Sequence, residues 1–572
     1  MHNHCPTRFR TGPRKQIALA LSLALGLAGT QALATSTTPS LLSSTGHSPA
    51  AALMRNAAAA GIALPRDLPY FMELAAKRQA ETDDAHPQAI IPVSNCGDSG
   101  PGSLRAVISS ASSNDVIDLS GLNCFITLSS SIVTSVDSLT IRGNPDNKYT
   151  ISGGDNGRVF THNGTGTLVL DGVTVADGRI TSDHAGPPLR GGCVYSKGSV
   201  KLTKQAQVTD CEARHTVPYG VPTTQGGAIF AADTVTVENG SRVANGTAVS
   251  PGGTVAGGGI HASQVILSRA LIENNRAIVS GANMNVYGGG IHADALNAKY
   301  SVVRNNHVIT LTGATVTTAT GGGAHITGGD STFIMSSTFS GNTVDARNAI
   351  RGGGAAIRLS SSAANAFEIR SSTIANNTTI KSTRWGGALS LSANAIIRSS
   401  TISGNIEKTH SDNPAESKYG AGITLGQNVQ LTMTSTIVAN NQAMTLADEH
   451  AMASDLGIGY FEGATAEVVG APNFINYSDT DISWQDGYLG SVSTLVRLGP
   501  LQDNGGLTMT MMPLPNSPVI DQGSTEGISP IFPGTSLLDQ RGSGFPRVVG
   551  PQADIGAVEW STRIFADGFE SD

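Results

Sequence analysis

The chain has 572 residues, of which 39% are hydrophobic, 14% are charged and 68 are glycine. Ordinary globular proteins are roughly 25% charged, and disordered chains combine high charge with low hydrophobicity, so this composition indicates a folded, glycine-rich chain. The formal net charge is −7, and it becomes −11 (32 minus 43) without the first 34 residues, which carry four basic and no acidic side chains. Such a negative balance argues against nucleic acid as a partner.

Residues 1–34 have the parts of a secretory signal peptide. A basic segment and the apolar run 17–28 precede the small-x-small cleavage site Ala32-Leu33-Ala34. The alternative is an uncleaved membrane anchor, although the run is short for a span of about 20 residues. We expect cleavage before Thr35, a secreted or cell-surface location, and no transmembrane segment in the mature chain.

Two regions separate the signal from the repeats described below. Residues 35–90 are rich in Ala, Ser, Thr and Pro and are predicted to form a low-complexity linker. Residues 91–190 are predicted to form an N-terminal cap and the first coils, with Ser103 as the N-cap of one short helix. Alternating strands are expected at 116–119, 125–128, 139–142, 149–152, 159–162 and 168–170.

Residues 191–445 consist of repeats. A glycine-rich strand start occurs eight times at intervals of 31 to 35 residues, at Gly191, Gly226, Gly257, Gly288, Gly321, Gly352, Gly386 and Gly420. In six copies an Asn follows 18 to 25 residues later, namely Asn275, Asn306, Asn342, Asn377, Asn405 and Asn441. Cys211 and Gly246 stand at this place in the first two copies. Repeats of this period are typical of a solenoid.

The repeats are rich in Thr, Val, Ile, Ser and Gly with two-residue alternation, so they predict strands rather than helices. We therefore predict an all-β fold, a right-handed parallel β-helix (β-solenoid) with a short N-terminal capping helix and an irregular C-terminal module. The recurring Asn residues are expected to stack in a structural ladder. Asn tolerates the left-handed turn conformation, and its amide can donate to one neighbouring coil and accept from another.

One further column recurs four positions after each first glycine. Its members are Tyr195, Phe230, His261, His292, His325, Ala356, Ser390 and Thr424. Because the flanking residues are small or aliphatic, alternation predicts that the column points outward as an aromatic and imidazole stripe. Three interpretations are open: a stack that only stabilises the sheet, a surface for sugar rings, or a metal site formed by the histidines. The loops 277–287, 307–320 and 406–419 are candidate binding loops.

Four cysteines follow the signal. An even number in an exported chain suggests disulfides, and Cys96–Cys124 and Cys193–Cys211 are the hypothetical pairs. No CxxC pair indicates a zinc site, and the sequence predicts no cofactor.

Several motifs resemble known families. Gly226-Gly227-Ala228-Ile229 and Phe339-Ser340-Gly341-Asn342 resemble the repeats of polymorphic outer-membrane proteins, and 98–108 resembles the CSLREA-type segment of secreted β-helix proteins. The series 503–508, 517–523, 539–542 and 554–559 is similar to a choice-of-anchor C-terminal module, which places the last coils and this module at 446–560. The tail 561–572 resembles that of some secreted proteins. These resemblances imply surface location and no established reaction.

Catalytic groups are sparse in the repeats. The local acidic groups are Asp83-Asp84, Asp448-Glu449 and 479–481, and solvated loop charges account for them. Asp521, Asp539, Arg541 and Asp554 are expected to build turns and ion pairs within the C-terminal module. We therefore predict a monomeric protein for adhesion or for binding carbohydrate or another surface ligand. The alternatives are a polysaccharide lyase or glycoside hydrolase, which needs converging carboxylates, and a structural surface spacer.

Overall fold

We describe the protein from a computed structural model. The described residues are 89–144, 149–184, 186–218, 223–311, 315–328, 332–360, 367–380, 386–409, 420–445, 451–459, 464–525 and 537–561. The predicted signal peptide, nearly all of the predicted linker and tail, and the acidic pairs at 83–84 and 448–449 lie outside these residues. The chain divides into the units Met1–His86 and Pro87–Asp572, and the fold below is that of the second unit.

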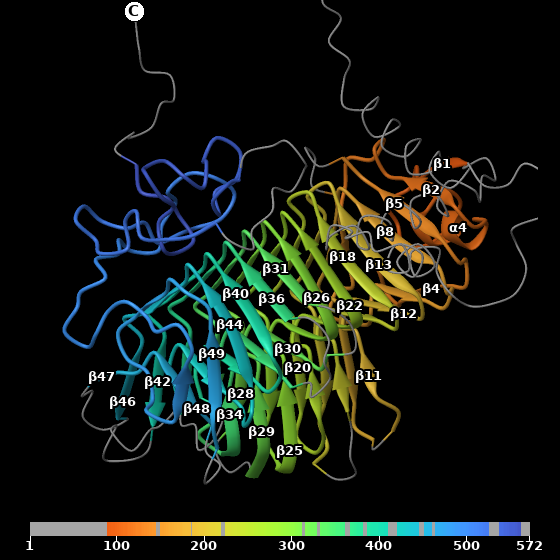
Figure 1. Ribbon diagram of the computed structural model, residues 1–572. Coiled ribbons are helices and arrows are strands. Elements are labelled where there is room, and N and C mark those ends of the chain that lie inside the picture. The colour runs from red at the N-terminus through yellow and green to blue at the C-terminus, as the bar shows by residue number, and fades with distance from the viewer. Residues whose placement is uncertain are drawn as a thin grey trace, which may run out of the picture. The chain divides into compact units, whose positions relative to one another are not determined.

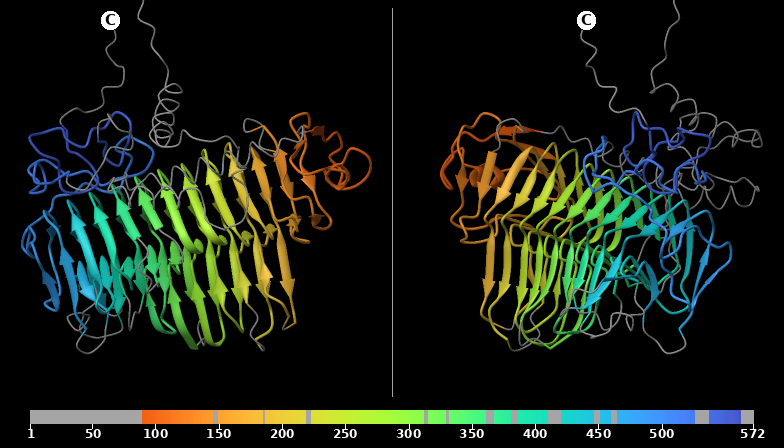
Figure 2. Two further views of the ribbon diagram at one scale, coloured as in Figure 1. Left: turned by 45° about the vertical axis from the view of Figure 1, so that its right-hand side comes forward. Right: turned by 90° about the vertical axis from the view of Figure 1, so that its left-hand side faces the viewer.

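Pro87–Asp572 forms a parallel β-solenoid of about nine turns, which confirms the predicted all-β class (Figures 1 and 2). One coil runs through β22 (Ile260–Ser268), β23 (Leu271–Glu273), β24 (Arg276–Val279) and β25 (Ala282–Tyr287), and the next begins at β26 (Ile291–Lys299). The helix α4 (Leu104–Ser109) covers the N-terminal end of the core, and the Ser103 hydroxyl accepts from the Ala106 N–H as its N-cap, as predicted.

Four sheets run along the solenoid, and the largest, sheet A, contributes one long or two short strands per coil. Its strands are β1 (Ile90–Pro92), β2 (Asp115–Asp118), β4 (Ile132–Thr134), β5 (Leu139–Arg142), β7 (Phe160–His162), β8 (Thr167–Asp171), β12 (Val194–Ser196), β13 (Ser199–Thr203), β17 (Ile229–Ala231), β18 (Thr234–Glu238), β22, β26, β30 (Ala324–Ile326), β31 (Thr332–Met335), β35 (Ile357–Leu359), β36 (Phe367–Arg370), β39 (Leu389–Leu391), β40 (Ala395–Arg398), β43 (Ile423–Leu425), β44 (Gln430–Thr434), β48 (Leu456–Ile458), β49 (Ala466–Val469) and β51 (Ile482–Trp484).

Sheet B follows sheet A in each coil. It contains β3 (Ile126–Thr127), β6 (Tyr149–Ser152), β9 (Val173–Ala176), β14 (Gln207–Thr209), β19 (Arg242–Ala244), β23, β27 (Val302–Arg304), β32 (Thr338–Ser340), β37 (Thr373–Ala375), β41 (Thr401–Ser403), β45 (Ile437–Ala439) and β50 (Phe474–Ile475).

Sheets C and D complete the coils. Sheet C contains β10 (Arg179–Ser182), β15 (Glu212–His215), β20 (Thr247–Ser250), β24, β28 (His307–Thr310), β33 (Thr343–Asp345), β38 (Thr378–Ile380), β42 (Ile406–Thr409), β46 (Gln442–Thr445) and β47 (Ala451–Ala453). Sheet D contains β11 (Leu189–Arg190), β16 (Thr224–Gln225), β21 (Val255–Ala256), β25, β29 (Thr315–Thr320) and β34 (Ala349–Gly353).

Sheets A and B enclose the main core, and sheets C and D form a flange with a second core. The inward residues of sheet C, such as Ala277 and Val308, pack against Val286 and Val316 of sheet D. The interpretation of 277–287 and 307–320 as loops was therefore wrong, because apolar side chains alternate there and bury a face. Both segments consist largely of strands. In Figure 1 the flange strands β25, β28, β29 and β34 lie below the strands of sheet A.

The chain after β51 folds into an irregular module that lies on the outer face of sheet B. Val496, Val519 and Ile555 of this module form a core with Ile437 and Phe474 of the sheet. In Figure 1 it is the blue irregular ribbon above β40 and β44. Among the described residues, no helix is both long enough and apolar enough to cross a membrane.

Candidate functional site

The aromatic and imidazole column predicted from the sequence is continuous in the structure. Tyr195, Phe230, His261, His292 and His325 are direct neighbours in the register of sheet A. Consecutive ring centroids lie 5.5, 5.3, 4.8 and 5.3 Å apart, and the first three pairs are stacked within 9° of parallel. The flanking residues Val194 and Ser196 are buried, so the column points away from the main core, as alternation predicts.

The next position of the column is Arg358 and not Ala356. Arg358 pairs with His325 on one side and Ser390 on the other, and Ser390 pairs with Thr424. The repeat in this copy starts at Gly354, which has φ +65°, because Gly352 still belongs to the last strand of sheet D. The assignment of Ala356 from glycine spacing was therefore wrong by two residues.

The column lies in the inner angle between sheets A and D, which we call the seam. Residues of sheet D that precede each glycine block face it: the Arg190 guanidinium lies 4.6 Å from the Phe230 ring, and the Tyr287 ring meets His325 edge-on at 4.6 Å. Phe230 and His325 are consequently only 6% and 4% exposed. Tyr195, His261 and His292 stay partly exposed, as do Arg190 and Tyr287. The stripe is thus recessed, with some of its members open to solvent.

The imidazoles of the seam are uncharged at neutral pH. Burial lowers the pKa of His261 to about 3 and that of His292 to about 4, and neighbouring His292 and Arg190 lower the His261 pKa further. The pKa of His325 is also lowered by burial, and its ring bonds Thr320 and Ser360. The Nδ1 atoms of His261 and His292 are buried without a hydrogen-bond partner. A buried polar atom without a partner costs about 1–3 kcal/mol.

Two arginines lie at the N-terminal end of the seam. Arg158 donates to the carbonyl oxygens of Gly191 and Arg190 and to the Thr161 hydroxyl, and its guanidinium lies 5.4 Å from the Tyr195 ring. Burial lowers the pKa of Arg158 to about 10. Arg190 donates to Gln225. All these acceptors are neutral, so this end of the seam carries two charged groups without a carboxylate partner in the described part of the chain.

The histidines stack and do not converge. Among the described residues there is no group of three or more His, Cys, Asp or Glu side chains that could hold a metal ion. Because the rings stack, their faces are turned toward one another.

The Asn residues form a ladder along the turn between sheets B and C. The Nδ2 of each donates to the Oδ1 of the next at 2.8–3.0 Å, from Asn275 through Asn441, and the last acceptor is the Asp455 carboxylate. All are fully buried. The left-handed residue of the turn is the preceding one, such as Asn274 or Gly341, and not the ladder Asn itself. That part of the expectation was wrong because the ladder amide must point inward.

Sequence reasoning missed a second ladder at the turn between sheets A and B. Hydroxyls at Ser301, Ser337, Ser372, Ser400 and Thr436 each accept from the backbone N–H of the equivalent residue one coil earlier. Each hydroxyl also donates to the carbonyl two residues before it. The signal was present, since each stands five residues before a ladder Asn.

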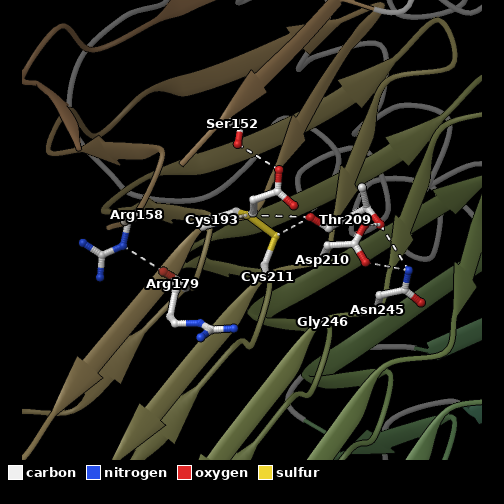
Figure 3. Close-up of a disulfide and its surroundings, with 12 residues drawn as sticks. Ser152, Arg158, Arg179, Cys193, Thr209, Asp210, Cys211, Asn245 and Gly246 are labelled. Atoms are coloured by element: carbon white, nitrogen blue, oxygen red, sulfur yellow. Dashed lines mark hydrogen bonds between the residues drawn. A yellow bond between two sulfur atoms is a disulfide. The ribbon is translucent and has the colours of Figure 1, made fainter. Parts of the chain in front are cut away.

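Both proposed cysteine pairs are joined, Cys96 to Cys124 and Cys193 to Cys211. Figure 3 shows the disulfide between Cys193 and Cys211, and Cys211 occupies the ladder position of its coil. The Cys193 sulfur accepts from the Gly178 N–H. Gly246 in the next coil has no side chain, and its N–H donates to Asn275. The disulfide therefore closes the N-terminal end of the ladder, and Asp455 closes the other.

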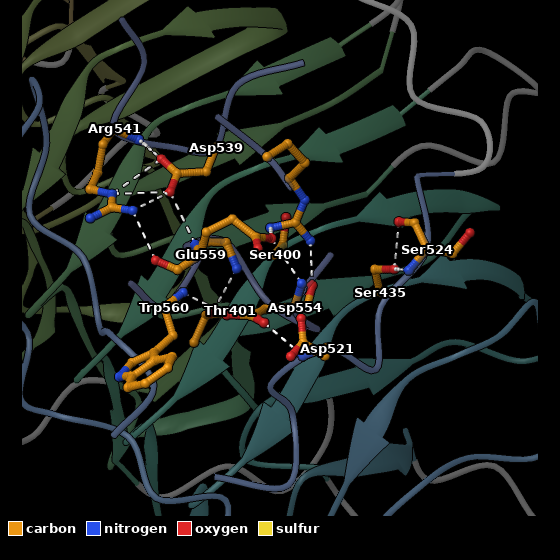
Figure 4. A network of polar contacts seen from close by, with 12 residues as sticks. Ser400, Thr401, Ser435, Asp521, Ser524, Asp539, Arg541, Asp554, Glu559 and Trp560 are labelled. Carbon is orange, nitrogen blue, oxygen red and sulfur yellow. Dashed lines mark hydrogen bonds and ion pairs between the residues drawn. The ribbon is translucent and has the colours of Figure 1, made fainter. Parts of the chain in front are cut away.

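Five charged residues of the C-terminal module are buried together, namely Asp539, Arg541, Arg547, Asp554 and Glu559 (Figure 4). Asp539 pairs with Arg541, and Arg547 lies 3.2 Å from Glu559. The Asp554 carboxylate accepts from the Asp521 and Trp560 N–H groups. Burial raises the pKa of Glu559 to about 8, which reduces the negative charge of the cluster. Turn formation and ion pairing thus account for these residues, and the module is held to sheet B by bonds such as Ala557 N–H to Thr401.

A comparison of the chain with protein-family models, curated proteins and solved structures finds no match.

Proposed function

We propose that the protein is an exported, surface-located β-helix that binds an extended carbohydrate along the seam, without acting on it. The observation that carries the proposal is the unbroken register from Tyr195 to His325, which repeats one ring per coil. Equivalent strands of stacked coils lie about 4.8 Å apart. In an extended polymer of sugars, successive sugar rings would then contact successive coils of the solenoid.

The manner of contact follows from the stacking. Ring faces within the column are occupied by neighbouring rings, so a ligand meets the exposed edges of Tyr195, His261 and His292. Edges carry hydroxyl and N–H groups, which bond sugar hydroxyls. Two disulfides support an oxidising, extracellular location.

The test is a glycan array run beside a reducing-end release assay on the full chain. We expect binding without release, and Tyr195→Ala to weaken it by about tenfold, because an aromatic contact contributes about 0.5–1.5 kcal/mol and the hydroxyl adds a hydrogen bond. Tyr488→Ala is the matched control, since Tyr488 is an exposed aromatic residue beyond the last coils. Release of sugars, or equal loss in both variants, would overturn the proposal.

A further inference from the structure

The N-terminal end of the seam places two like charges on neighbouring coils. Arg158 donates to the backbone carbonyl of Arg190, so the two residues are in direct contact. Both guanidinium groups lie over rings of the column, Arg158 over Tyr195 and Arg190 over Phe230. Neutral acceptors and aromatic rings thus hold both guanidinium groups at this end of the seam.

Nearby carboxylates do not compensate these charges. Asp155 and Glu212 pair with Arg179, which lies in sheet C. Asp233, at the start of β18, accepts from the Ser199 hydroxyl, and Asp294 accepts from the Thr327 hydroxyl. Neither is paired with Arg158 or Arg190. The exposed Lys197 adds a third positive charge beside Tyr195. The seam end is therefore cationic in a chain whose net charge is −7.

We propose that the Arg158–Arg190 pair binds the anionic group of an acidic polysaccharide, a carboxylate or a sulfate, whose sugar rings continue along the column. This deepens the proposed function and rests on it. Arginine is suited to this role because its planar fork bonds a carboxylate or sulfate through two parallel N–H groups.

Arg190 is the better residue to change, because among the described residues its side chain donates to Gln225 alone, whereas Arg158 supports two backbone carbonyls. The experiment measures binding of the full chain to polygalacturonate, to a sulfated dextran and to neutral dextran, at low and high salt. We expect both acidic polymers to bind, with affinity falling as salt rises. We expect Arg190→Gln to weaken this binding by at least about tenfold.

Arg214→Gln is the matched control. It removes the same charge one coil further on, but Arg214 lies in sheet C, is exposed and already pairs with Glu212. We expect it to bind acidic polymers like the unchanged chain. A second readout is thermal unfolding: polygalacturonate should raise the midpoint of the unchanged chain and of Arg214→Gln but not of Arg190→Gln. Without polymer, Arg190→Gln should unfold slightly earlier than the unchanged chain, because the contact with the Phe230 ring is lost, so the shift caused by polymer is measured within each variant.

The outcomes separate this inference from the proposed function. Binding to neutral dextran with equal affinity, or acidic-polymer binding that Arg190→Gln leaves unchanged, would overturn the anion site and leave carbohydrate binding standing. Absence of binding to every glycan, on these polymers and on the array, would overturn both.

Discussion

The ladder and the seam follow the same one-coil repeat, but the polar atoms of the ladder are hydrogen-bonded whereas several of those in the seam are not. Along the turn between sheets B and C, each ladder amide donates to the next coil and accepts from the previous one, and all are fully buried. On the flange side of the coil, His261 and His292 each have a buried Nδ1 without a partner, and Arg158 and Arg190 have no carboxylate partner among the residues that the structure describes. The ladder amides thus satisfy one another between coils, whereas the two buried Nδ1 atoms of the seam have no such partner.

Sheet C of the flange also contains an unsatisfied carboxylate. Glu407 points into the inner face of sheet C, beyond the last strand of sheet D, and both of its carboxylate oxygens are buried without a hydrogen-bond partner. The carboxylate lies against Gly386, where a Cβ would come within 2.5 Å of both oxygens. The contrast between satisfied ladder groups and unsatisfied flange groups therefore includes sheet C. It predicts which substitutions lower the free energy of unfolding.

The largest effect is expected from breaking the ladder at its middle. Asn342→Leu removes the acceptor for the Asn306 backbone and side-chain N–H groups and the donor to the Val303 carbonyl. Each buried group left unpaired costs about 1–3 kcal/mol, so the free energy of unfolding should fall by about 4 kcal/mol, measured by urea denaturation.

Asn297→Ala is the control for the ladder. Asn297 lies one coil away on the outward side of sheet A, is partly exposed and accepts a single bond from the Phe333 N–H. Loss of this bond should lower the free energy of unfolding by about 1 kcal/mol. Equal losses for the two variants would show that the ladder is no more important than an ordinary surface amide.

The second effect concerns pH. Burial raises the pKa of Glu407 from its ordinary 4.5 to about 8. This carboxyl ionises at lower pH in the unfolded chain than in the folded chain. Its contribution to the free energy of unfolding is therefore complete below about pH 4.5 and is lost as the pH rises through 8. Between pH 5 and 8 the difference in unfolding free energy should be about 3 kcal/mol, and Glu407→Gln should lack this part of the dependence.

Asp455 and Glu559 also have raised pKa values, so they contribute a dependence of the same sign in both chains. The difference between the unchanged chain and Glu407→Gln isolates Glu407. Glu467→Gln is the control, because the Glu467 carboxylate bonds the exposed side chains of Gln430 and Gln485. Parallel pH curves for the unchanged chain and Glu407→Gln would contradict the assignment.

The sequence predicts the stacking well because stacking is periodic. A glycine block and an Asn in phase fix the register of sheets A and B, and with it the column from Tyr195 to His325. The flange is harder to predict because its strands, such as β24 and β25, are joined by segments of variable length, so no fixed spacing marks them. Ala277 and Val279 are alternate apolar positions and indicate a strand, but the segment is predicted above to be a loop.

Local spacing also cannot show what covers a column. That the stripe is recessed depends on sheet D, whose residues Arg190 and Tyr287 come from positions just before the glycine blocks. The two-residue slip at Arg358 has a similar origin, since sheet D extends to Gly353 in that coil. The unpaired state of Glu407 depends on where sheet D ends, which is a property of the assembled sheets.

The smallest effect is expected within the seam itself. His292→Phe keeps a flat ring between His261 and His325 and removes the buried Nδ1 that lacks a partner. The gain from removing an unpaired buried atom is opposed by the strain of a larger ring, so the free energy of unfolding should change by no more than about 1 kcal/mol in either direction. The same substitution removes the imidazole edge from the seam, so binding on the glycan array should weaken. Stability unchanged with binding reduced would separate the seam from the ladder, because a ladder residue cannot be changed without loss of stability. A loss of stability comparable to that of Asn342→Leu would instead mean that the column is structural, and the contrast between the two columns would not hold.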